Sequence, residues 1–303
     1  MFLTNKYIKK INKKAFTIIE ISVVILVISV MIVGVMTSKS MVTKSRLANA
    51  QSLTQQSYVN EISDDLIAWY ETSLEGSFNA SEIKNDGSYI TAWKDSNKTV
   101  VTKNNATVTT PLNTANQPTL IQNVFYNSIP GLRFSGNQYL NFDGRKFAQN
   151  SYTIFLVEQR SSNKSENYFI GGTGSSLNSN LSLGYENNTS ILFSHYPSES
   201  PTFNRYISSY KPQTPIIHTF LFNNTIGKRH SINGGSIFIN TPAQTTSITS
   251  FNLAMIGAYN PSGTLKTYVG DLAEIIMFKR SLKTEEIEAI ESYLGSKYGI
   301  PVS

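Results

Sequence analysis

The chain has 303 residues, of which only 15% are charged, and it is rich in aromatic side chains, with 16 Tyr and 16 Phe. It contains no cysteine, which excludes disulfide bonds, thiol catalysis and cysteine metal sites. The formal net charge of +6 comes mostly from the first 46 residues, so the remainder is nearly neutral and offers no basic face for nucleic acid.

The amino-terminal pattern is typical of a membrane segment. Residues 1–15 contain lysines but no acid, and residues 16–36 are almost entirely aliphatic. A helix over this run would be about 31 Å long at about 1.5 Å per residue, close to a hydrocarbon core of about 30 Å. The pattern predicts a retained, single-pass anchor whose amino terminus is cytosolic and whose carboxyl-terminal body lies outside the cytosol.

One acid interrupts the aliphatic run. Glu20 lies about one helical turn inside it, where a carboxylate costs about 2.5–3.5 kcal/mol on insertion scales. One explanation is that Glu20 reaches the membrane interface. The other comes from a resemblance: the string Lys13-Lys14-Ala15-Phe16-Thr17-Ile18-Ile19-Glu20 resembles the type IV prepilin signature.

The prepilin resemblance implies a role for three residues. Ala15 would end the leader, and a prepilin peptidase would cleave between Ala15 and Phe16 before Phe16 is N-methylated. Glu20 would be the assembly carboxylate, paired with the terminal amine of a neighbouring pilin or pseudopilin subunit. The family usually has glycine at the position of Ala15, and the proline common within the pilin helix is absent here. An amphipathic continuation predicts one helix over 16–63, either packed on the body or other subunits or serving as a stalk.

Residues 64–303 show a different pattern, with short runs of β-branched and aromatic residues bounded by Asn, Gly, Ser or Pro. Asn233-Gly234 is a strong hairpin-turn pattern. Many strands without intervening helices predict an antiparallel sandwich. The expected strands include 66–70, 152–160, 191–196, 216–223 and 272–278.

A short carboxyl-terminal helix follows the last expected strand. Thr284 is expected to cap it, Glu285 and Glu286 suit its positive end, and Gly299 ends it. Its apolar stripe consists of Ile287, Ile290, Leu294 and Tyr298.

Several strings in the body look like the concanavalin A-like, laminin-G-like jelly rolls of bacterial surface proteins. They include DDLIAWYE, PGLRFSGNQYLNF, YTIFLVEQR and the closing stretch from IGAYNPSG to SKYGI, and they cover nearly all of 64–303. The resemblance implies one jelly roll that closes on its own first strand. It also implies that Trp69 and Trp93 are core residues, with Asp271 at a turn and Glu274 bonded to a neighbouring loop.

Patterns of catalysis are missing. No strand carries alternating acids suited to glycoside hydrolysis, and the close-set Glu286, Glu288 and Glu291 are expected mostly on the solvated side of the terminal helix. The histidines His195, His218 and His230 lack metal-ligand spacing and are interpreted as hydrogen-bonded sheet residues. The glycine-rich stretch 171–174 is interpreted as a tight sheet turn. The sequence therefore predicts a non-enzymatic protein.

Two features remain as candidate binding sites. Tyr185, Tyr196, Tyr206 and Tyr210 fall in the looser stretch 180–215, where a glycan-binding rim is a hypothesis from composition. Asp95-Ser96-Asn97 and Asn141-Phe142-Asp143 carry oxygen ligands that suit calcium, but neither cluster alone supplies the six to eight oxygens of a site. The expectation is therefore no cofactor or metal, with bound calcium as the alternative.

The leading hypothesis is a structural or assembly subunit of a type IV pilus or type II secretion pseudopilus, in a minor, tip or adhesive role. The alternative is a membrane-anchored glycan-binding lectin or adhesin that uses prepilin export. A glycan hydrolase has the least support, because paired acids are missing. The expected partners are prepilin peptidase, other pilin subunits, inner-membrane lipid and surface glycans, and the expected domains are 1–15, 16–63 and 64–303.

Overall fold

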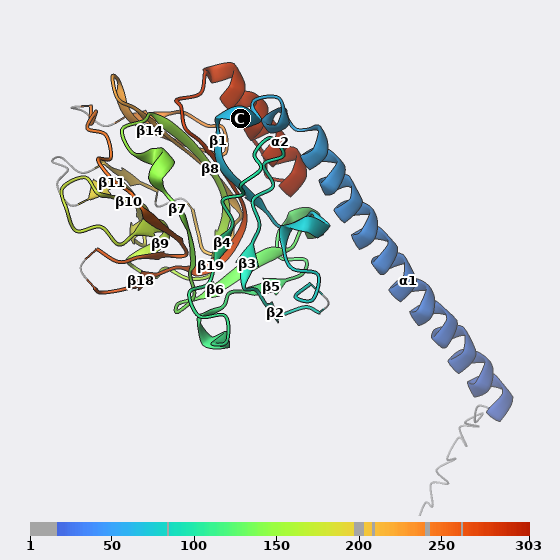
Figure 1. Cartoon of the computed structure of the whole chain (residues 1–303). Coiled ribbons are helices and arrows are strands. Elements are labelled where there is room, and N and C mark those ends of the chain that lie inside the picture. Colours follow the sequence, from blue (N-terminus) through green and yellow to red (C-terminus); the bar gives the residue numbers. More distant parts are fainter. Residues whose placement is uncertain (1–16, 84, 197–202, 208–209, 240–242, 262) are drawn as a thin grey trace, which may run out of the picture. The chain divides into compact units, whose positions relative to one another are not determined.

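The structure is a computed structural model that describes residues 17–303 apart from 84, 197–202, 208–209, 240–242 and 262 (Figure 1). The side chains of 34–37 and 39 are also outside the description. The chain divides into two compact units, residues 1–44 and residues 45–303.

Helix α1 spans Ile18–Gln56 and ends earlier than the predicted residue 63. The hydroxyl of Ser57 and the amide of Asn60 both donate to the carbonyl oxygen of Thr54, at 3.0 Å each. These side chains satisfy a carbonyl that the next helical turn would otherwise use, so the helix stops. Two short 3₁₀ turns, η1 (Tyr58–Asn60) and η2 (Ser63–Asp65), then lead into the sandwich.

The first part of α1 exposes its aliphatic side chains, including Ile18 (84% exposed), Leu26 (66%) and Val33 (64%). Within the described part of the chain, no helix is both long and apolar enough to cross a membrane, and the predicted transmembrane segment is therefore not confirmed.

The predicted antiparallel sandwich is confirmed. Among the described residues, one sheet has nine strands in the order β15-β14-β13-β8-β19-β6-β5-β2, with β1 paired to β19 as well. Its strands are β1 (Leu66–Glu71), β2 (Ser88–Tyr89), β5 (Thr119–Ile121), β6 (Gly131–Ser135), β8 (Tyr152–Arg160), β13 (Ile216–Asn223), β14 (Gly227–Ile232), β15 (Phe238–Ile239) and β19 (Val269–Phe278).

The second sheet, in the part of the chain that the structure describes, has eight strands in the order β12-β11-β10-β9-β16-β7-β4-β3. Its strands are β3 (Ala92–Trp93), β4 (Ala106–Thr107), β7 (Leu140–Asp143), β9 (Asn167–Gly172), β10 (Asn180–Asn187), β11 (Ser190–Tyr196), β12 (Phe203–Tyr206) and β16 (Leu253–Ile256). A small third pair joins β17 (Ala258–Tyr259) to β18 (Lys266–Thr267).

Strand β8 is apolar on both faces because both of its faces are covered. Ile154 and Leu156 lie in the core between the two sheets. Phe155 and Val157 lie on the opposite face, in a second cluster with side chains of the terminal helix α2 (Thr284–Tyr298). A strand buried on both faces is expected to be almost continuously hydrophobic, as the segment YTIFLVEQR is.

Helix α2 confirms the predicted terminal helix, with one change at its start. Lys283, not Thr284, is the N-cap, and its backbone N–H donates to the Glu286 carboxylate at 2.8 Å. Gly299 closes the helix at a φ of 68°, a conformation that glycine adopts without strain. The helix packs beside β1 and β19, so the chain does close on its first strand, as expected (Figure 1).

Two local turn predictions have different outcomes. Asn233 and Gly234 both have positive φ, 51° and 70°, as the hairpin pattern requires, although β15 begins only at Phe238. The glycine-rich stretch does not form a tight turn from its first residue, because Gly171 and Gly172 belong to β9.

Candidate functional site

The processing residues Ala15 and Phe16 lie outside the described residues. Glu20 lies in the first turn of α1, where one carboxylate oxygen accepts the Thr17 backbone N–H at 2.8 Å and the Thr17 hydroxyl at 3.0 Å. Within the chain, Glu20 therefore satisfies a free amide at the helix start. Its neighbours Ile19 and Ile21 are 75% and 49% exposed.

A buried charge cluster joins α2 to the nine-stranded sheet. Lys297 Nζ lies 2.8 Å from Glu274 Oε2 and 3.2 Å from Glu71 Oε2, and all three side chains are fully excluded from solvent. Burial acts to raise the pKa of Glu71, but the Lys297 charge and hydrogen bonds from Ser73 and Ser77 outweigh it, and the pKa is lowered. The other donors to Glu274 are Trp69 Nε1 and the Tyr293 and Tyr298 hydroxyls.

This cluster corrects the expected role of Glu274, which bonds to a strand and a helix and not to a loop. Asp271 lies within β19 and not at a turn, where it holds Arg133 of β6 through two hydrogen bonds of 2.7 and 2.9 Å. Trp69 and Trp93 are both buried, at 2% and 0% exposure, which confirms their prediction as core residues. These residues hold the fold together and present no surface to a ligand.

The expected tyrosine rim does not include Tyr185. Its side chain is fully buried in the core, and its hydroxyl donates to Glu158 at 2.5 Å. Tyr268 donates to the same carboxylate, and His218 Nε2 lies 3.3 Å from it. The Tyr185 hydroxyl therefore provides a hydrogen-bond donor to the buried carboxylate of Glu158. Composition alone missed this, because strand alternation decides which face each side chain of β10 occupies.

The other three candidate tyrosines are not brought together as a rim. Tyr206 is 71% exposed at the edge strand β12. Tyr196, at the end of β11, packs its ring against Tyr259 at a centroid distance of 5.7 Å. Tyr210 is partly buried against the core, where its carbonyl accepts a hydrogen bond from Arg160.

All three histidines are buried at 0% exposure, as expected for sheet residues. His195 Nε2 lies 2.6 Å from the Tyr152 hydroxyl, and its Nδ1 lies 2.6 Å from the Thr246 carbonyl. His218 and His230 face each other at 3.0 Å. Burial lowers the pKa of His195 and of His230 well below the ordinary value.

The two oxygen-rich clusters proposed for calcium meet at Asn104. Asp95 accepts backbone N–H groups from Trp69, Asn97 and Asn104, at 2.9, 3.0 and 3.1 Å. The Asn104 side chain in turn bonds the backbone N–H and carbonyl of Asp143, at 2.9 Å each. Among the described residues, no group of three or more His, Cys, Asp or Glu side chains is placed to hold a metal ion. The hydrogen bonds of Asp95 and Asn104 thus hold the loop 103–105 against β7.

An open cleft of about 730 Å³ lies beside the loop 103–105, on the outer face of the eight-stranded sheet. Asn141 and Asp143 of β7 point away from the core, because they alternate with the buried Leu140 and Phe142. The strand register places Thr107 opposite Asn141 on one side and Leu253 opposite Asp143 on the other. The remaining lining residues are Lys103, Asn104, Asn105, Phe142, Arg145 and Asn252.

The cleft offers both donors and acceptors. Asn141 donates its amide to the Thr109 hydroxyl at 2.6 Å, while its Oδ1 is buried and has no hydrogen-bond partner in the described structure. An unpaired buried acceptor costs about 1–3 kcal/mol. The polar side chains of the cleft that a ligand can reach are those of Asn105, Thr107 and Asn252, which are exposed. Leu253, 44% exposed, adds an apolar surface beside these polar groups.

Charge in the cleft is mainly positive. Arg145 and Asp143 form a forked ion pair with contacts of 2.6–3.0 Å, and the hydrogen bonds from Arg145 lower the pKa of Asp143. Lys103 donates to the neutral carbonyl of Asn97, and Lys146 also acts on Asp143 through its charge. Among the residues that line the cleft, one acid is therefore set against two cations, and Lys146 lies next to them in the chain.

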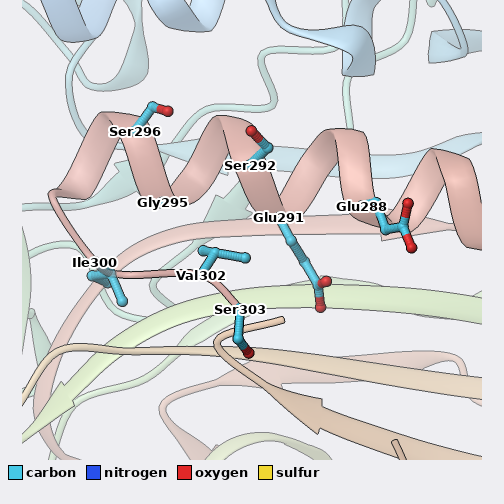
Figure 2. A pocket seen from close by; sticks show the side chains of 8 residues that line it. All are labelled: Glu288, Glu291, Ser292, Gly295, Ser296, Ile300, Val302 and Ser303. Atoms are coloured by element: carbon cyan, nitrogen blue, oxygen red, sulfur yellow. The ribbon is translucent and has the colours of Figure 1, made fainter. Parts of the chain in front are cut away.

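Two further cavities border α2. One, of about 450 Å³, is lined by Glu288, Glu291 and the chain's last residues, Ile300, Val302 and Ser303. Figure 2 shows Glu291 pointing from the helix toward the strand beneath it, while Ser292 and Ser296 point to the other side. Glu291 is only 4% exposed and accepts from Thr219 at 2.5 Å and Ser231 at 3.0 Å, so the expectation that it is solvated was wrong. The other cavity, of about 200 Å³, lies between α2 and β14 and shares Glu288 and Glu291.

No protein-family model matches the sequence, and no curated protein matches it either. Solved structures do share its fold. The Trypanosoma rangeli sialidase in complex with sialic acid matches at a TM-score of 0.51 and 16% identity, over 79% of this chain and 34% of the sialidase chain. A mutant of that sialidase displaying trans-sialidase activity matches at 0.50 and 13%, over 86% and 39%.

A shorter likeness, at a TM-score of 0.41 and 15% identity, is to the CBM40 of the Ruminococcus gnavus IT-sialidase bound to α2,3-sialyllactose, over 53% of this chain and 95% of that one. The chain spans about a third of the length of the sialidases it matches. At these identities the likeness shows the fold alone, a two-sheet antiparallel β sandwich.

The sequence drew attention to Asn141 and Asp143 but not to Lys103, Asn105, Thr107, Arg145 or Asn252. The string Lys103-Asn104-Asn105-Ala106-Thr107 has no distinctive spacing. These residues become part of the cleft because Asn104 bonds to Asp143 of β7, nearly forty residues later in the chain.

Proposed function

We propose that the chain is a non-enzymatic, lectin-like surface protein whose sandwich binds glycans at the cleft between β4, β7 and β16. The observation that carries this proposal is an open cleft of about 730 Å³ to which Asn105, Thr107 and Asn252 present exposed amides and a hydroxyl. Sugar hydroxyls donate and accept hydrogen bonds, and Asn and Thr side chains do the same. The fold shared with the matched third of a sialidase is compatible with such a role but supplies only the scaffold.

The cleft has the other attributes of a recognition site. Its loop is fixed by Asp95 and Asn104, so little ordering is required when a ligand binds. Leu253 provides an apolar patch for the carbon face of a sugar ring. The cleft is open, which suits an oligosaccharide better than a small molecule that must be enclosed.

A glycan array probed with the purified full chain in mild detergent tests this proposal. The wild-type protein is expected to retain a defined subset of glycans, and Asn141→Ala is expected to weaken their binding at least fivefold. Asn188→Ala is the matched control, because Asn188 is an exposed asparagine beyond β10, toward the opposite edge of the same sheet. Failure to bind any glycan, or equal effects of the two substitutions, would overturn the proposal.

The second candidate function is assembly into a type IV pilus or pseudopilus at a bacterial inner membrane, with the sandwich displayed outside the cytosol. It is supported by the prepilin-like string before Glu20 and by the exposed aliphatic side chains that surround Glu20 in α1. An acid among exposed aliphatics suits a contact with a cationic group of a neighbouring subunit. Prepilin peptidase and other pilin subunits are the partners in this proposal, and a minor or tip position would present the glycan-binding cleft.

Filaments sheared from cells test the assembly role. Glu20→Gln is expected to reduce the protein's incorporation about tenfold or more, because it removes the charge but keeps the shape. Ser29→Ala is the control, since the Ser29 hydroxyl donates to the carbonyl of Ile25 in the preceding turn. Mass spectrometry of the native amino terminus should find N-methylated Phe16. Normal incorporation of Glu20→Gln together with an intact Met1 would end this proposal.

A further inference from the structure

The charges around the cleft differ from those expected for a site that takes neutral sugars. Lys103 and Arg145 line it, and Lys146 follows Arg145 directly. Arg145 is paired with Asp143, yet its side chain is 73% exposed and retains donors for a second partner. Within the described residues, no acid lies within ion-pair distance of Lys103, whose ammonium donates to the neutral Asn97 carbonyl.

The opposite edge of the same sheet shows a different balance. There Glu186 accepts a hydrogen bond from the neutral amide of Asn204, and Arg205 of β12 donates to the His230 carbonyl. Cations occur at both edges of this sheet, and the residues that line the cleft carry two cations, Lys103 and Arg145, against one acid, Asp143. A ligand with negative charge is therefore favoured in the cleft.

We infer that the cleft selects anionic glycans over neutral ones, with Lys103 and Arg145 as the residues that determine this specificity. This inference rests on the proposed glycan-binding function and adds the chemical class of the ligand. The anionic group is a carboxylate, as in uronic or sialic acids, or a sulfate ester. The planar, forked guanidinium of Arg145 fits either group, and the Lys103 ammonium adds a second point charge.

The backbone and the side chain of Asp143 have separate roles at the cleft. Its backbone N–H and carbonyl hold Asn104, whereas its side-chain oxygens bond the Arg145 backbone and side chain. Asp143→Asn would therefore preserve the loop while removing the acid that competes with the ligand for Arg145. Binding of anionic glycans should become tighter, an effect that a merely structural role of Asp143 would not produce.

Calorimetric titration of the full chain with defined oligosaccharides of equal length tests the inference. The probes are a hyaluronan fragment (carboxylate), a chondroitin sulfate fragment (carboxylate and sulfate), 3′-sialyllactose with its neutral trisaccharide counterpart, and a neutral maltooligosaccharide. We expect anionic probes to bind at least tenfold more tightly than neutral probes, and this advantage to shrink as salt is raised from about 50 to about 300 mM. The carboxylate and sulfate probes then identify which anion is preferred.

The variants make each outcome decisive. Each of Lys103→Gln and Arg145→Gln should weaken anionic binding about two- to fivefold, and Asp143→Asn should strengthen it by a similar factor. Lys211→Gln is the control, because Lys211 is an exposed lysine that follows the opposite edge strand β12. Equal or tighter binding of neutral probes would overturn the inference while leaving glycan binding intact. Absence of binding to every probe would overturn the proposed function itself.

Discussion

Lys297 of α2 and Glu274 of β19 form an ion pair of 2.8 Å in which both side chains are fully excluded from solvent. Glu71 of β1 shares the same ammonium at 3.2 Å. The Lys297 ammonium of the last helix therefore contacts carboxylates of both the first and the last strand of the sandwich. These ion pairs hold the closing segment against the first strand.

Replacement of Lys297 by methionine is expected to lower the free energy of unfolding by about 3–5 kcal/mol. The change keeps most of the side-chain volume but leaves two buried carboxylates without a counter-charge. Chemical denaturation followed by tryptophan fluorescence would measure it, since Trp69 donates to Glu274. Lys279→Met at an exposed position is the control and should change stability by less than about 0.5 kcal/mol. A loss below about 1 kcal/mol for Lys297→Met would show that the cluster is dispensable.

Mild acid is expected to destabilise the sandwich through its buried histidines. Burial lowers the pKa of His195 and His230 in the folded state, while in the unfolded chain each takes up a proton near the ordinary value of 6.5. Above that pH both states are neutral and these residues have no effect. Below it the unfolded state binds more protons, so the free energy of unfolding falls by about 1.4 kcal/mol per pH unit for each histidine.

Denaturation curves between pH 8 and pH 5 would show this dependence. His195→Asn isolates one histidine, because an asparagine amide can still donate to the Thr246 carbonyl. The slope below pH 6.5 should be smaller in the variant than in the wild-type protein. A free energy of unfolding that stays level from pH 8 to pH 5 would contradict the argument.

Gly172 of β9 has no room for a side chain. A Cβ atom there would lie 2.4 Å from the Phe251 ring and 2.9 Å from the Leu253 backbone oxygen. Gly172→Ala is therefore expected to cost about 1–3 kcal/mol through overpacking. Gly76→Ala is the matched control, since no atom lies within 4 Å of that position. Equal thermal unfolding of the two variants would be inconsistent with the observed packing.

Tyr206→Ala is expected to leave glycan binding unchanged within about twofold. Tyr206 lies on β12, whereas the cleft is built on β4, β7 and β16, so about 19 Å separates the strand of the tyrosine from β16, the nearest strand of the cleft, at about 4.8 Å per strand. Titration of Tyr206→Ala beside Asn141→Ala with the same oligosaccharide measures the difference. A larger loss at Tyr206 than at Asn141 would move the binding site to the opposite edge of the sheet.

The sequence predicted much of the fold because strands depend on local alternation. The segments at 152–160 and 216–223 coincide with β8 and β13, and the terminal helix is displaced only at its cap. The end of α1 was predicted less well. Its termination depends on Ser57 and Asn60 turning back to one carbonyl, and polar residues of this kind also occur within helices.

The candidate site was harder to predict. Asn141 and Asp143 were noted for their oxygen atoms, but calcium was the chemistry considered, because their neighbours in space were unknown. Tyr185 was assigned to a surface rim, although it lies in the core beside Glu158. Composition does not show in which direction a side chain points. In a strand, neighbouring side chains point to opposite faces, so a shift of one residue moves a side chain from the surface to the core.

The sequence by itself determined the β-rich sandwich, its closing helix and the absence of cysteine chemistry, since each follows from residue types and spacings within a short stretch. Only the tertiary structure decided where the proposed binding cleft lies. The cleft requires Thr107, Asn141 and Leu253 to lie on adjacent strands, and hydrogen bonding between strands far apart in the chain brings them together. Such pairing is set by the burial of the opposite faces of those strands, which no local pattern records.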